Sequence, residues 1–378
     1  MTDRSTRALR QRVAIDGSKP TASPLFQTAA FQSGSEFFYS RKDNPNVREF
    51  EQAMAAWENA QHALAVTTGM SALSLLMGLL RAGDTLVCHR LMYGCSLRLF
   101  QQQVEERHIS LLMMDLDDPA ELARLPTSTR LVIFETPTNP FLRTVPIAPV
   151  AAAAKRANPA AIVAVDGTWA TPLFQQPLRH GADVVLHSAT KFISGHSDVM
   201  GGVLLCDNTD LANWLRERRF YHGANLDPHS AWLLTRSLKT FPLRMREHAT
   251  VTRKMVALLR TFPAIERVDF PQVGDGQLDD YGGIVFVQLH QSYTHCYEAI
   301  IAALRLFDTG TGMAAVTSMV AQPYSGSHAS LNDAQKSDIG LNRGLVRLCF
   351  GLEAIEDLAA DLTQAFFGLI PVAPNSDV

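Results

Sequence analysis

The feature that most restricts the fold is a regular alternation of short apolar segments with helical patterns between residues 63 and 206. The apolar segments have the length and β-branched content of buried strands, and they lie at residues 85–88, 111–114, 131–134, 162–165, 184–186 and 203–206. Strands that alternate with helices in this way build a parallel sheet covered by helices on both faces. The sequence therefore predicts a large α/β domain with a mainly parallel sheet.

Beyond residue 206 the pattern changes. The sequence predicts four helices there, at residues 228–239, 242–259, 297–306 and 355–366. It also predicts strands at residues 284–289 and 345–350, which indicates a smaller C-terminal α/β domain. Residues 1–45 lack strong periodicity, so we expect them to form an arm that contacts a neighbouring subunit. We expect a large domain at residues 46–245 and a small domain at residues 246–378.

The composition excludes several classes of partner. The chain has 378 residues, 47% of them apolar, and its formal net charge of −3 offers no basic surface for nucleic acid or an anionic membrane. It has neither an apolar run of the roughly twenty residues that cross a bilayer nor a signal-peptide core, so we expect a cytoplasmic protein that binds a small molecule. Five cysteines without CxxC spacing argue against disulfides and against a metal site. We interpret Cys88, Cys206 and Cys349 as packed strand residues.

Lys191 follows one of the predicted strands, in the segment 182–202 that reads ADVVLHSATKFISGHSDVMGG. Ligands bind at the carboxyl ends of strands in open α/β sheets, so this lysine is expected to face a pocket. Burial there favours the neutral amine, which is the form that attacks an aldehyde. The hydroxyls of Ser188 and Thr190 can bind an anion beside it. A phosphate next to a Schiff-base lysine indicates pyridoxal phosphate, and the alternative is an ordinary surface lysine.

Candidate cofactor-binding residues follow three other apolar segments. Asp166 can pair with the pyridine nitrogen of the same cofactor and keep it protonated, or it can simply cap a turn. Gly69 and Met70 open a helical run after an apolar segment, and the start of such a helix can bind a phosphate. Tyr93 can stack on an aromatic ring, although many tyrosines at such places only pack.

Eight motifs occur in order along nearly the whole chain. They are YSRKDNP (39–45), TTGMSAL (67–73), MYGCS (92–96), ETPTNP (135–140), VDGTWATP (165–172), HSATKFISGHSD (187–198), AWLLTRSLKT (231–240) and LVRLCFG (345–351). With them the chain resembles the Cys/Met-metabolism branch of the fold-type I pyridoxal phosphate enzymes. That branch includes cystathionine synthases and lyases, methionine γ-lyases and homoserine-ester sulfhydrylases.

The resemblance implies a role for each matching residue. Lys191 would form the Schiff base with pyridoxal 5'-phosphate, Asp166 would pair with the ring nitrogen and Tyr93 would stack on the ring. Arg347 would bind the substrate carboxylate, a task that suits a planar guanidinium, with Asn139 beside it. Further cofactor contacts are implied for Gly69, Met70, Asn139, Thr168, Ser188 and Thr190, and, from a neighbouring subunit, for Tyr39 and Arg41. Shared sites require a dimer, and the family suggests a homotetramer.

The resemblance also implies a lyase in which Lys191 removes the α-proton of an amino acid before a γ- or β-substituent is eliminated. For γ-elimination a second proton leaves the β-carbon. We expect Lys191 and the Tyr93 phenol to act at that step, the phenol with a pKa lowered by a cationic ring. If a thiol or carbon nucleophile enters instead, the chain is a γ-replacement transferase. A catalytically inert binding module is the third alternative.

Two local features bear on the substrate. Cys95 lies two residues after Tyr93, as in methionine γ-lyases, and is either a feature of γ-elimination or a small packed thiol. In the family this segment usually opens with a serine and carries a glutamate shortly after it. Here residues 312–318 read GMAAVTS, with glycine at the first position and no glutamate. Loss of a carboxylate there argues against cystathionine, whose distal ammonium needs one. A thiolate, an acyloxy group or a halide is then the expected leaving group.

Overall fold

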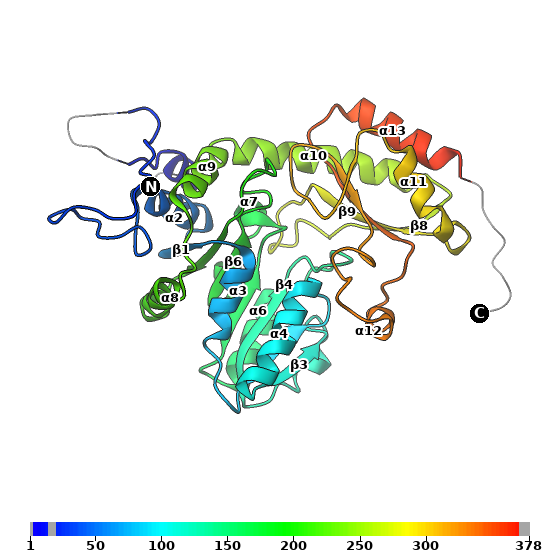
Figure 1. Cartoon of the computed structure of the whole chain (residues 1–378). Coiled ribbons are helices and arrows are strands. Elements are labelled where there is room, and N and C mark those ends of the chain that lie inside the picture. The colour runs from blue at the N-terminus through cyan, green and yellow to red at the C-terminus, as the bar shows by residue number, and fades with distance from the viewer. Residues whose placement is uncertain (1–2, 14–19, 370–378) are drawn as a thin grey trace.

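The computed structural model describes residues 3–13 and 20–369 (Figure 1). Helices surround a large sheet, and a second, smaller sheet lies toward the C-terminal end of the chain. The long helix α10 (Phe241–Leu259) packs on α9 of the first part and on strands of the second sheet. This arrangement confirms the expected fold class, an α/β protein with a mainly parallel sheet and a smaller second sheet.

Within the described residues the larger sheet has seven strands. In order across the sheet they are β1 (His62–Val66), β7 (Gly202–Cys206), β6 (Val184–Ser188), β5 (Ile162–Asp166), β4 (Thr129–Glu135), β2 (Thr85–His89) and β3 (Ser110–Met114). The strands from β3 to β6 pair in parallel, whereas β7 is antiparallel to both of its neighbours. The predicted strands of this part are confirmed.

The direction of β7 differs from the predicted parallel arrangement. Parallel strands need a long crossover, usually a helix, that returns across the face of the sheet. The connection at residues 189–201 contains turns and no helix, so the chain re-enters the sheet in the opposite direction. This connection carries Lys191.

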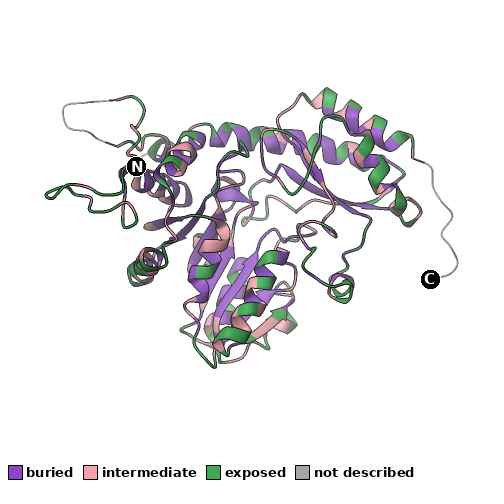
Figure 2. Cartoon of the chain, in the orientation of Figure 1, coloured by how far each residue is buried: buried purple, intermediate pink, exposed green. Residues whose placement is uncertain are grey.

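Helices cover both faces of the larger sheet, and its inner strands are buried, whereas the edge strand β3 is partly exposed (Figure 2). In β2, Leu86 and Cys88 belong to a core formed with α3, α4 and α8, whereas Val87 faces the core formed with α5 and α6. Side chains of successive strand residues point to opposite faces, which explains this division. The helices of this part are α2 (Pro45–Glu58), α3 (Gly69–Met77), α4 (Gly94–Arg107), α5 (Pro119–Leu122), α6 (Ile147–Ala157), α7 (Thr171–Phe174), α8 (Thr209–His222) and α9 (Pro228–Leu238), with the 3-10 turn η1 (Pro177–His180).

The start of α9 shows how the sequence sets a helix boundary. The Asp227 carboxylate accepts hydrogen bonds from the N–H groups of His229 (2.9 Å) and Ser230 (3.2 Å). Pro228 occupies the first helical position, where its missing N–H costs nothing. Helix α9 therefore begins where the sequence predicted.

Five strands of the described chain form the second sheet. Their order is β10 (Asp308–Thr309), β11 (Met319–Ala321), β12 (Leu345–Cys349), β9 (Ile284–Leu289) and β8 (Ile265–Asp269), and the helices beside them are η2 (Gln291–Cys296), α11 (Tyr297–Ala303), α12 (Asp333–Asp338) and α13 (Ile355–Phe367). The apolar side chains of α10, α11 and α13 pack on β9 and β12 in one core. Helix α11 is shorter than predicted because Leu304 has an extended backbone. Cys88, Cys206 and Cys349 are buried strand residues, as expected.

The N-terminal segment contains a short helix that its weak periodicity did not indicate. Helix α1 (Arg4–Leu9) packs on α2, and the Asp3 carboxylate caps it. Residues 1–2 and 14–19 of the expected arm lie outside the described residues. Among the helices described, none has both the length and the apolar character needed to cross a membrane.

Candidate active site

Three parallel strands of the larger sheet end side by side with polar residues. Glu135 and Asp166 are partners in the register of β4 and β5, and Ser188 ends β6, the next strand across. Parallel strands bring their carboxyl ends to one edge, where ligands of α/β proteins bind. A cavity of about 380 Å³ opens there, a size that suits a small ligand.

This cavity collects most of the residues that the sequence analysis singled out. Its walls include Gly69, Met70, Tyr93, Asn139, Asp166, Thr168, Ser188, Thr190, Lys191 and Arg347. Arg347 comes from β12 of the second sheet, and Thr311 and Met313 precede β11 of that sheet. The cavity therefore lies between the edge of the larger sheet and residues of the smaller one. Tyr39 and Arg41 of the same chain do not line it.

Lys191 lies in the turn that follows β6. Its backbone N–H donates to the carbonyl oxygen of Ser188 (3.2 Å), and its carbonyl accepts from the N–H of Gly195 (2.8 Å). Burial lowers the pKa of Lys191 below the ordinary lysine value, and the positive charge of Arg347 lowers it further. The amine loses its proton more readily than that of a surface lysine, and it faces a cavity. The surface alternative is therefore wrong.

Asp166 stands at the end of β5 and is held by the turn after it. The N–H of Thr168 donates to Asp166 Oδ1 (2.9 Å), and the Thr168 hydroxyl accepts from the N–H of Ser188 (2.8 Å). Asp166 thus caps a turn and also lines the cavity, so the turn contact is confirmed and the pairing with a ring nitrogen stays a prediction. Burial raises the pKa of Asp166, which means that a cationic partner is needed to keep the carboxylate charged.

The start of α3 forms a cradle beside Ser188. The Thr68 hydroxyl caps this helix by accepting from the N–H of Ser71 (3.0 Å). A Cβ on Gly69 would lie 3.0 Å from the Cβ of Ser188, and a Cβ on Gly202 would lie 2.3 Å from the carbonyl oxygen of Thr68. Because both positions lack a side chain, the helix start closely approaches the ends of β6 and β7. Free N–H groups at such a helix start suit a phosphate.

Tyr93 precedes α4, and its backbone N–H donates to Glu135 Oε1 (2.8 Å). Burial, with contributions from Cys95 and Glu135, raises the pKa of the phenol to about 12. The expectation of a lowered pKa is thus not met by the protein alone, because neighbouring groups stabilise the protonated phenol. Cys95 is exposed and hydrogen-bonds to Tyr93 without lining the cavity.

Arg347 keeps donor groups free for a ligand. Its Nη2 donates to the carbonyl oxygens of Gly312 (3.0 Å) and Thr311 (3.4 Å). Its Nε is buried and has no hydrogen-bond partner among the residues that the structure describes. A guanidinium has five N–H donors in a planar fork, so this side chain can bind a carboxylate without giving up its backbone contacts.

The altered segment at residues 312–318 ends in a buried serine. The Ser318 hydroxyl donates to Glu353 Oε2 (2.8 Å), and its N–H donates to Glu353 Oε1 (2.6 Å). Glu353, which follows β12, therefore places a carboxylate near this segment. It is not among the residues that line the cavity, and both of its oxygens accept hydrogen bonds from Ser318.

Two residues show what the cavity offers and what the sequence analysis missed. The side-chain oxygen of Asn139 is buried without a hydrogen-bond partner in the described part of the chain, which leaves it for a ligand. Glu135 also lines the cavity, although we had not assigned it to the site. Its place at the end of a predicted apolar strand, like that of Asp166, was the available signal.

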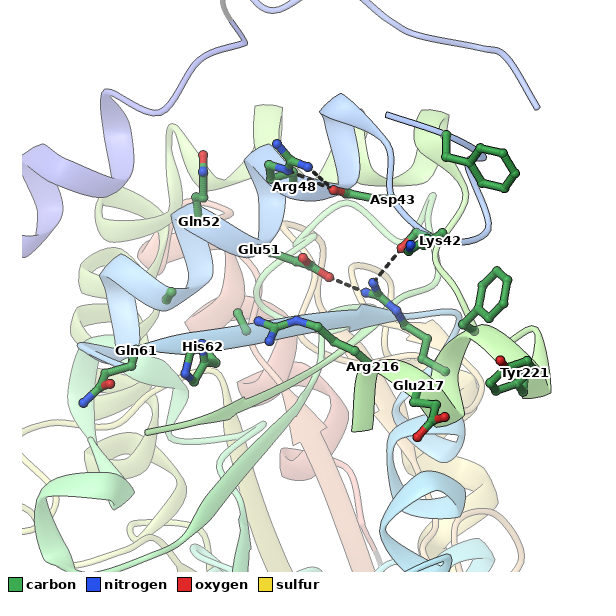
Figure 3. Close-up of a pocket in the computed structure, with 15 residues that line it drawn as sticks. Lys42, Asp43, Arg48, Glu51, Gln52, Gln61, His62, Arg216, Glu217 and Tyr221 are labelled. Carbon is green, nitrogen blue, oxygen red and sulfur yellow. Dashed lines mark hydrogen bonds and ion pairs between the residues drawn. The ribbon is translucent and has the colours of Figure 1, made fainter. Parts of the chain in front are cut away.

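A larger hollow of about 640 Å³ lies away from these strand ends (Figure 3). Two ion pairs lie within it, Arg219 with Glu51 and Arg48 with Asp43. Beside it, Arg41 stacks on the ring of Phe220 (4.3 Å from the centroid) and donates to the Phe220 carbonyl (3.0 Å). This hollow lacks the strand ends and the phosphate cradle, so the cavity at Lys191 is the candidate site.

The family model of the Cys/Met metabolism PLP-dependent enzymes matches this chain over residues 6–367. The chain belongs to this family. It is 35% identical to the L-methionine gamma-lyase of Pseudomonas deceptionensis, with 96% of each chain covered. It is 31% identical to the cystathionine beta-lyase of Lactococcus lactis subsp. cremoris (strain MG1363), over 97% of this chain and 99% of that protein. A crystal structure of cystathionine gamma synthase from Xanthomonas oryzae pv. oryzae, in complex with aminoacrylate and cysteine, is 31% identical with a TM-score of 0.91, over 97% of this chain and 98% of the other.

Membership in the family makes the protein a pyridoxal phosphate-dependent enzyme of the lyase and transferase group, and the inert alternative is wrong. The site fits this cofactor. A buried carboxylate that needs a cation, an amine with a lowered pKa and a helix start cleared by two glycines surround one cavity. These groups complement the ring nitrogen, the aldehyde and the phosphate of pyridoxal phosphate.

Proposed function

We propose that this enzyme eliminates an uncharged, sulfur-containing γ-substituent, or a β-substituent of the same kind, from an L-amino acid. The observation that supports this most directly is the convergence of Lys191, Asp166 and Arg347 on one cavity. In the bound state, pyridoxal phosphate supplies an electron sink for negative charge on the substrate carbons. The side chains of the cavity supply the binding, the orientation and the proton transfers.

Lys191 anchors the cofactor and, once released, takes the proton from the α-carbon. For γ-elimination the same amine takes a proton from the β-carbon. Arg347 binds the substrate carboxylate with the donor groups that its backbone contacts leave free. Asp166 pairs with the ring nitrogen, while Gly69, Met70, Ser188 and Thr190 hold the phosphate and Asn139 and Thr168 complete the contacts.

Tyr93 stacks on the cofactor ring and donates a proton to the leaving sulfur. Because its pKa is about 12 in the protein, the phenol is protonated at neutral pH and suits an acid better than a base. A protonated thiol is a much better leaving group than a thiolate. This role replaces the base that the sequence suggested.

The lining of the cavity favours an uncharged substituent. Among the described residues that line it, the acidic ones are Glu135 and Asp166. Burial and the nearby Asp166 hold the pKa of Glu135 well above its ordinary value, which disfavours a negative charge on this side chain. Glu135 is therefore a poor partner for a distal ammonium. Its apolar walls, formed by Met70, Leu73, Trp169, Met200 and Met313, favour a methionine-like thioether over cystathionine.

Replacement of the γ-substituent is the second candidate. It is favoured by the similarity to the cystathionine gamma synthase of Xanthomonas oryzae pv. oryzae, which is 31% identical with a TM-score of 0.91 over 97% of this chain. The two reactions share every proton transfer up to departure of the substituent. They differ in whether water or an added nucleophile consumes the product of that step.

A substrate panel separates the two. The purified enzyme, loaded with pyridoxal phosphate, is incubated with L-methionine, O-acetyl-L-homoserine and L-cystathionine, each with and without an added thiol, and products are identified by mass spectrometry. Release of 2-oxo acid, ammonia and thiol from methionine alone supports elimination. A thioether formed only with added thiol supports replacement, and cystathionine as the best substrate contradicts the proposed lining argument. Lys191→Ala is the inactive control.

We further propose a cytoplasmic homo-oligomer with shared sites, at least a dimer and, from the family resemblance, a homotetramer. Residues 1–45 form the contacting arm, residues 46–245 the cofactor-binding domain and residues 246–378 the small domain. Tyr39 and Arg41 would reach the phosphate of a neighbouring subunit. Support comes from Phe38 and Tyr221, large side chains that are each 72% exposed beside the hollow in Figure 3. Sedimentation of the purified protein tests the assembly, and a monomer with full activity contradicts it.

A further inference from the structure

Behind Asp166 lies a buried pair of ionisable side chains that the proposed mechanism does not use. Glu58 is the last residue of α2, and His187 lies in β6, one residue before Ser188. His187 Nε2 and Glu58 Oε2 are 3.0 Å apart, and the two residues are 1% and 0% exposed. A buried carboxylate that meets an imidazole away from solvent needs a reason, because removing such groups from water is costly.

The imidazole of His187 packs against Gly167. A Cβ on Gly167, the residue after Asp166, would lie 2.8 Å from His187 Cε1 and 3.4 Å from Nδ1. Only glycine therefore leaves room for this ring edge. His187 Nδ1 has no hydrogen-bond partner within residues 3–13 and 20–369, and the charge of His187 lowers the pKa of Asp166 against the effect of burial. The ring thus contacts Glu58 through Nε2 and acts on Asp166 electrostatically.

A third charged group closes the outer end. Arg4 of α1 donates to the carbonyl oxygens of Trp57 (3.0 Å) and Pro172 (2.7 Å), which fixes its guanidinium near Glu58. Burial raises the pKa of Glu58, while His187, Arg4 and Arg179 lower it. These are the charged groups that act on Glu58, and Asp166 is the further ionisable group on which His187 acts. Acidic and basic side chains therefore alternate outward from the cavity, in the order Asp166, His187, Glu58 and Arg4.

We propose that Glu58 and His187 are positioning residues that act through Asp166 to strengthen its hold on the ring nitrogen of the bound cofactor. The inference rests on the proposed pairing of Asp166 with that nitrogen. Glu58 fixes the ring of His187 against Gly167, and the polarised imidazole favours negative charge on Asp166. A negative Asp166 in turn favours a proton on the ring nitrogen, and helix α1 supports this arrangement from the protein surface.

The test compares cofactor affinity for two ligands. One is pyridoxal phosphate and the other is 1-deazapyridoxal phosphate, in which a C–H group replaces the ring nitrogen. Glu58→Gln keeps the shape and a hydrogen-bond acceptor but removes the charge. It is expected to weaken binding of pyridoxal phosphate about tenfold, the equivalent of one pKa unit, and to leave binding of the deaza analogue within about twofold. His187→Gln is expected to show the same selectivity.

Glu49→Gln is the matched control, because Glu49 is a second buried carboxylate of α2 that accepts from the Ser23 hydroxyl (2.8 Å) and does not contact His187. It is expected to change neither affinity. Thermal unfolding without cofactor monitors folding of every variant. Equal losses for both ligands in Glu58→Gln, or no loss for either, overturn the proposal. Asp166→Asn distinguishes a failure of the proposed Asp166 pairing from a failure of the Glu58 and His187 proposal. If it too fails to discriminate between the ligands, the pairing of Asp166 with the ring nitrogen is wrong; if it discriminates and Glu58→Gln does not, only the relay is wrong.

Discussion

Glu135 and Asp166 face each other across the adjacent parallel strands β4 and β5, where the register pairs them. Both line the cavity, and burial raises the pKa of both above that of a carboxyl group in water. Two adjacent buried carboxylates repel each other, so one of the two groups holds a proton while the other ionises. Burial and the charge of Asp166 raise the pKa of Glu135, whereas two hydrogen bonds from Thr168 and the charge of His187 oppose the effect of burial on the pKa of Asp166. Glu135 is therefore the partner that favours the proton, and Asp166 is the one that favours the charge.

This division predicts that Glu135→Gln stabilises the protein without cofactor. The pKa of Glu135 is raised on folding, so the folded state binds more protons than the unfolded state above the ordinary value of 4.5, and stability falls as pH rises through that window. The glutamine variant lacks this penalty and still accepts from Tyr93. We expect its melting temperature to exceed that of the parent by a few degrees at pH 8 and the difference to shrink toward pH 4.5. A difference that is constant with pH would contradict the assignment.

Lys191 is predicted to react with pyridoxal phosphate at lower pH than an ordinary lysine. Its lowered pKa leaves more neutral amine at a given pH, because burial and Arg347 disfavour the ammonium. Borohydride trapping followed by peptide mass spectrometry should label Lys191 with a midpoint below pH 10.5, the ordinary lysine value. Lys191→Ala should lose the label and the yellow colour. Equal labelling of surface lysines would argue against a selective site.

Arg347→Lys is predicted to weaken substrate capture more than turnover. Lysine keeps the charge but loses the planar fork that can bind a carboxylate while still donating to Gly312. We expect KM to rise about 10- to 100-fold with a smaller change in kcat, as measured by steady-state kinetics. Arg343→Lys, at an exposed position two residues before β12, is the control and should leave both constants unchanged. If kcat falls and KM does not change, Arg347 acts in the chemical step instead.

Tyr93→Phe is predicted to slow elimination in proportion to how poorly the substituent leaves. The phenol, with a pKa of about 12, donates a proton that a thiolate needs and an acetate needs much less. General acid catalysis contributes about 10²- to 10⁴-fold, so we expect a loss in this range for methionine. The loss for O-acetyl-L-homoserine should be clearly smaller in the same assay. Equal losses for the two substrates would indicate that Tyr93 serves ring stacking alone.

The sequence was sufficient for the strands of the larger sheet and for most of the site residues at their carboxyl ends, whereas β8, β10 and β11 of the second sheet and the site residue Glu135 were not predicted. Each strand of the larger sheet is a short apolar run, and Asp166 and Lys191 follow directly from where two such runs stop. The antiparallel direction of β7 could also have been inferred, because its connection from β6 contains no helical pattern. The helix start at Gly69 was found by the same local reasoning.

Contacts between distant segments could not be inferred from local patterns. Glu58 and His187 are far apart in the sequence, and each looks like an ordinary element end until the fold brings α2 against β6. The pKa of Tyr93 depends on burial and on Glu135, neither of which its own segment reveals. Arg347 was placed by resemblance, since nothing around it in the sequence identifies the backbone oxygens that orient it.

The last prediction concerns Gly312, where the family's usual serine is absent. A Cβ at this position would lie 2.6 Å from the Sδ of Met319 and 2.7 Å from its Cε. Met319 therefore fills the space that a side chain at residue 312 would need. Since the Gly312 carbonyl also orients Arg347, a shift here moves the group that we propose binds the substrate carboxylate. The clashing atoms lie at the far end of a flexible, half-buried side chain, so we expect Gly312→Ser to cost about 0.5–1.5 kcal/mol of stability, as for a side chain forced off its preferred rotamer, and to raise KM.

Met319→Ala opens the same space and should rescue that variant. In a double-mutant cycle, Gly312→Ser combined with Met319→Ala should be more stable than the sum of the two single changes predicts, with KM restored toward the parent value. Chemical denaturation and steady-state kinetics of the four proteins measure both effects. Strict additivity would mean that Met319 does not set the residue at position 312. A KM that stays high while stability recovers would mean that the serine hydroxyl itself competes for Arg347.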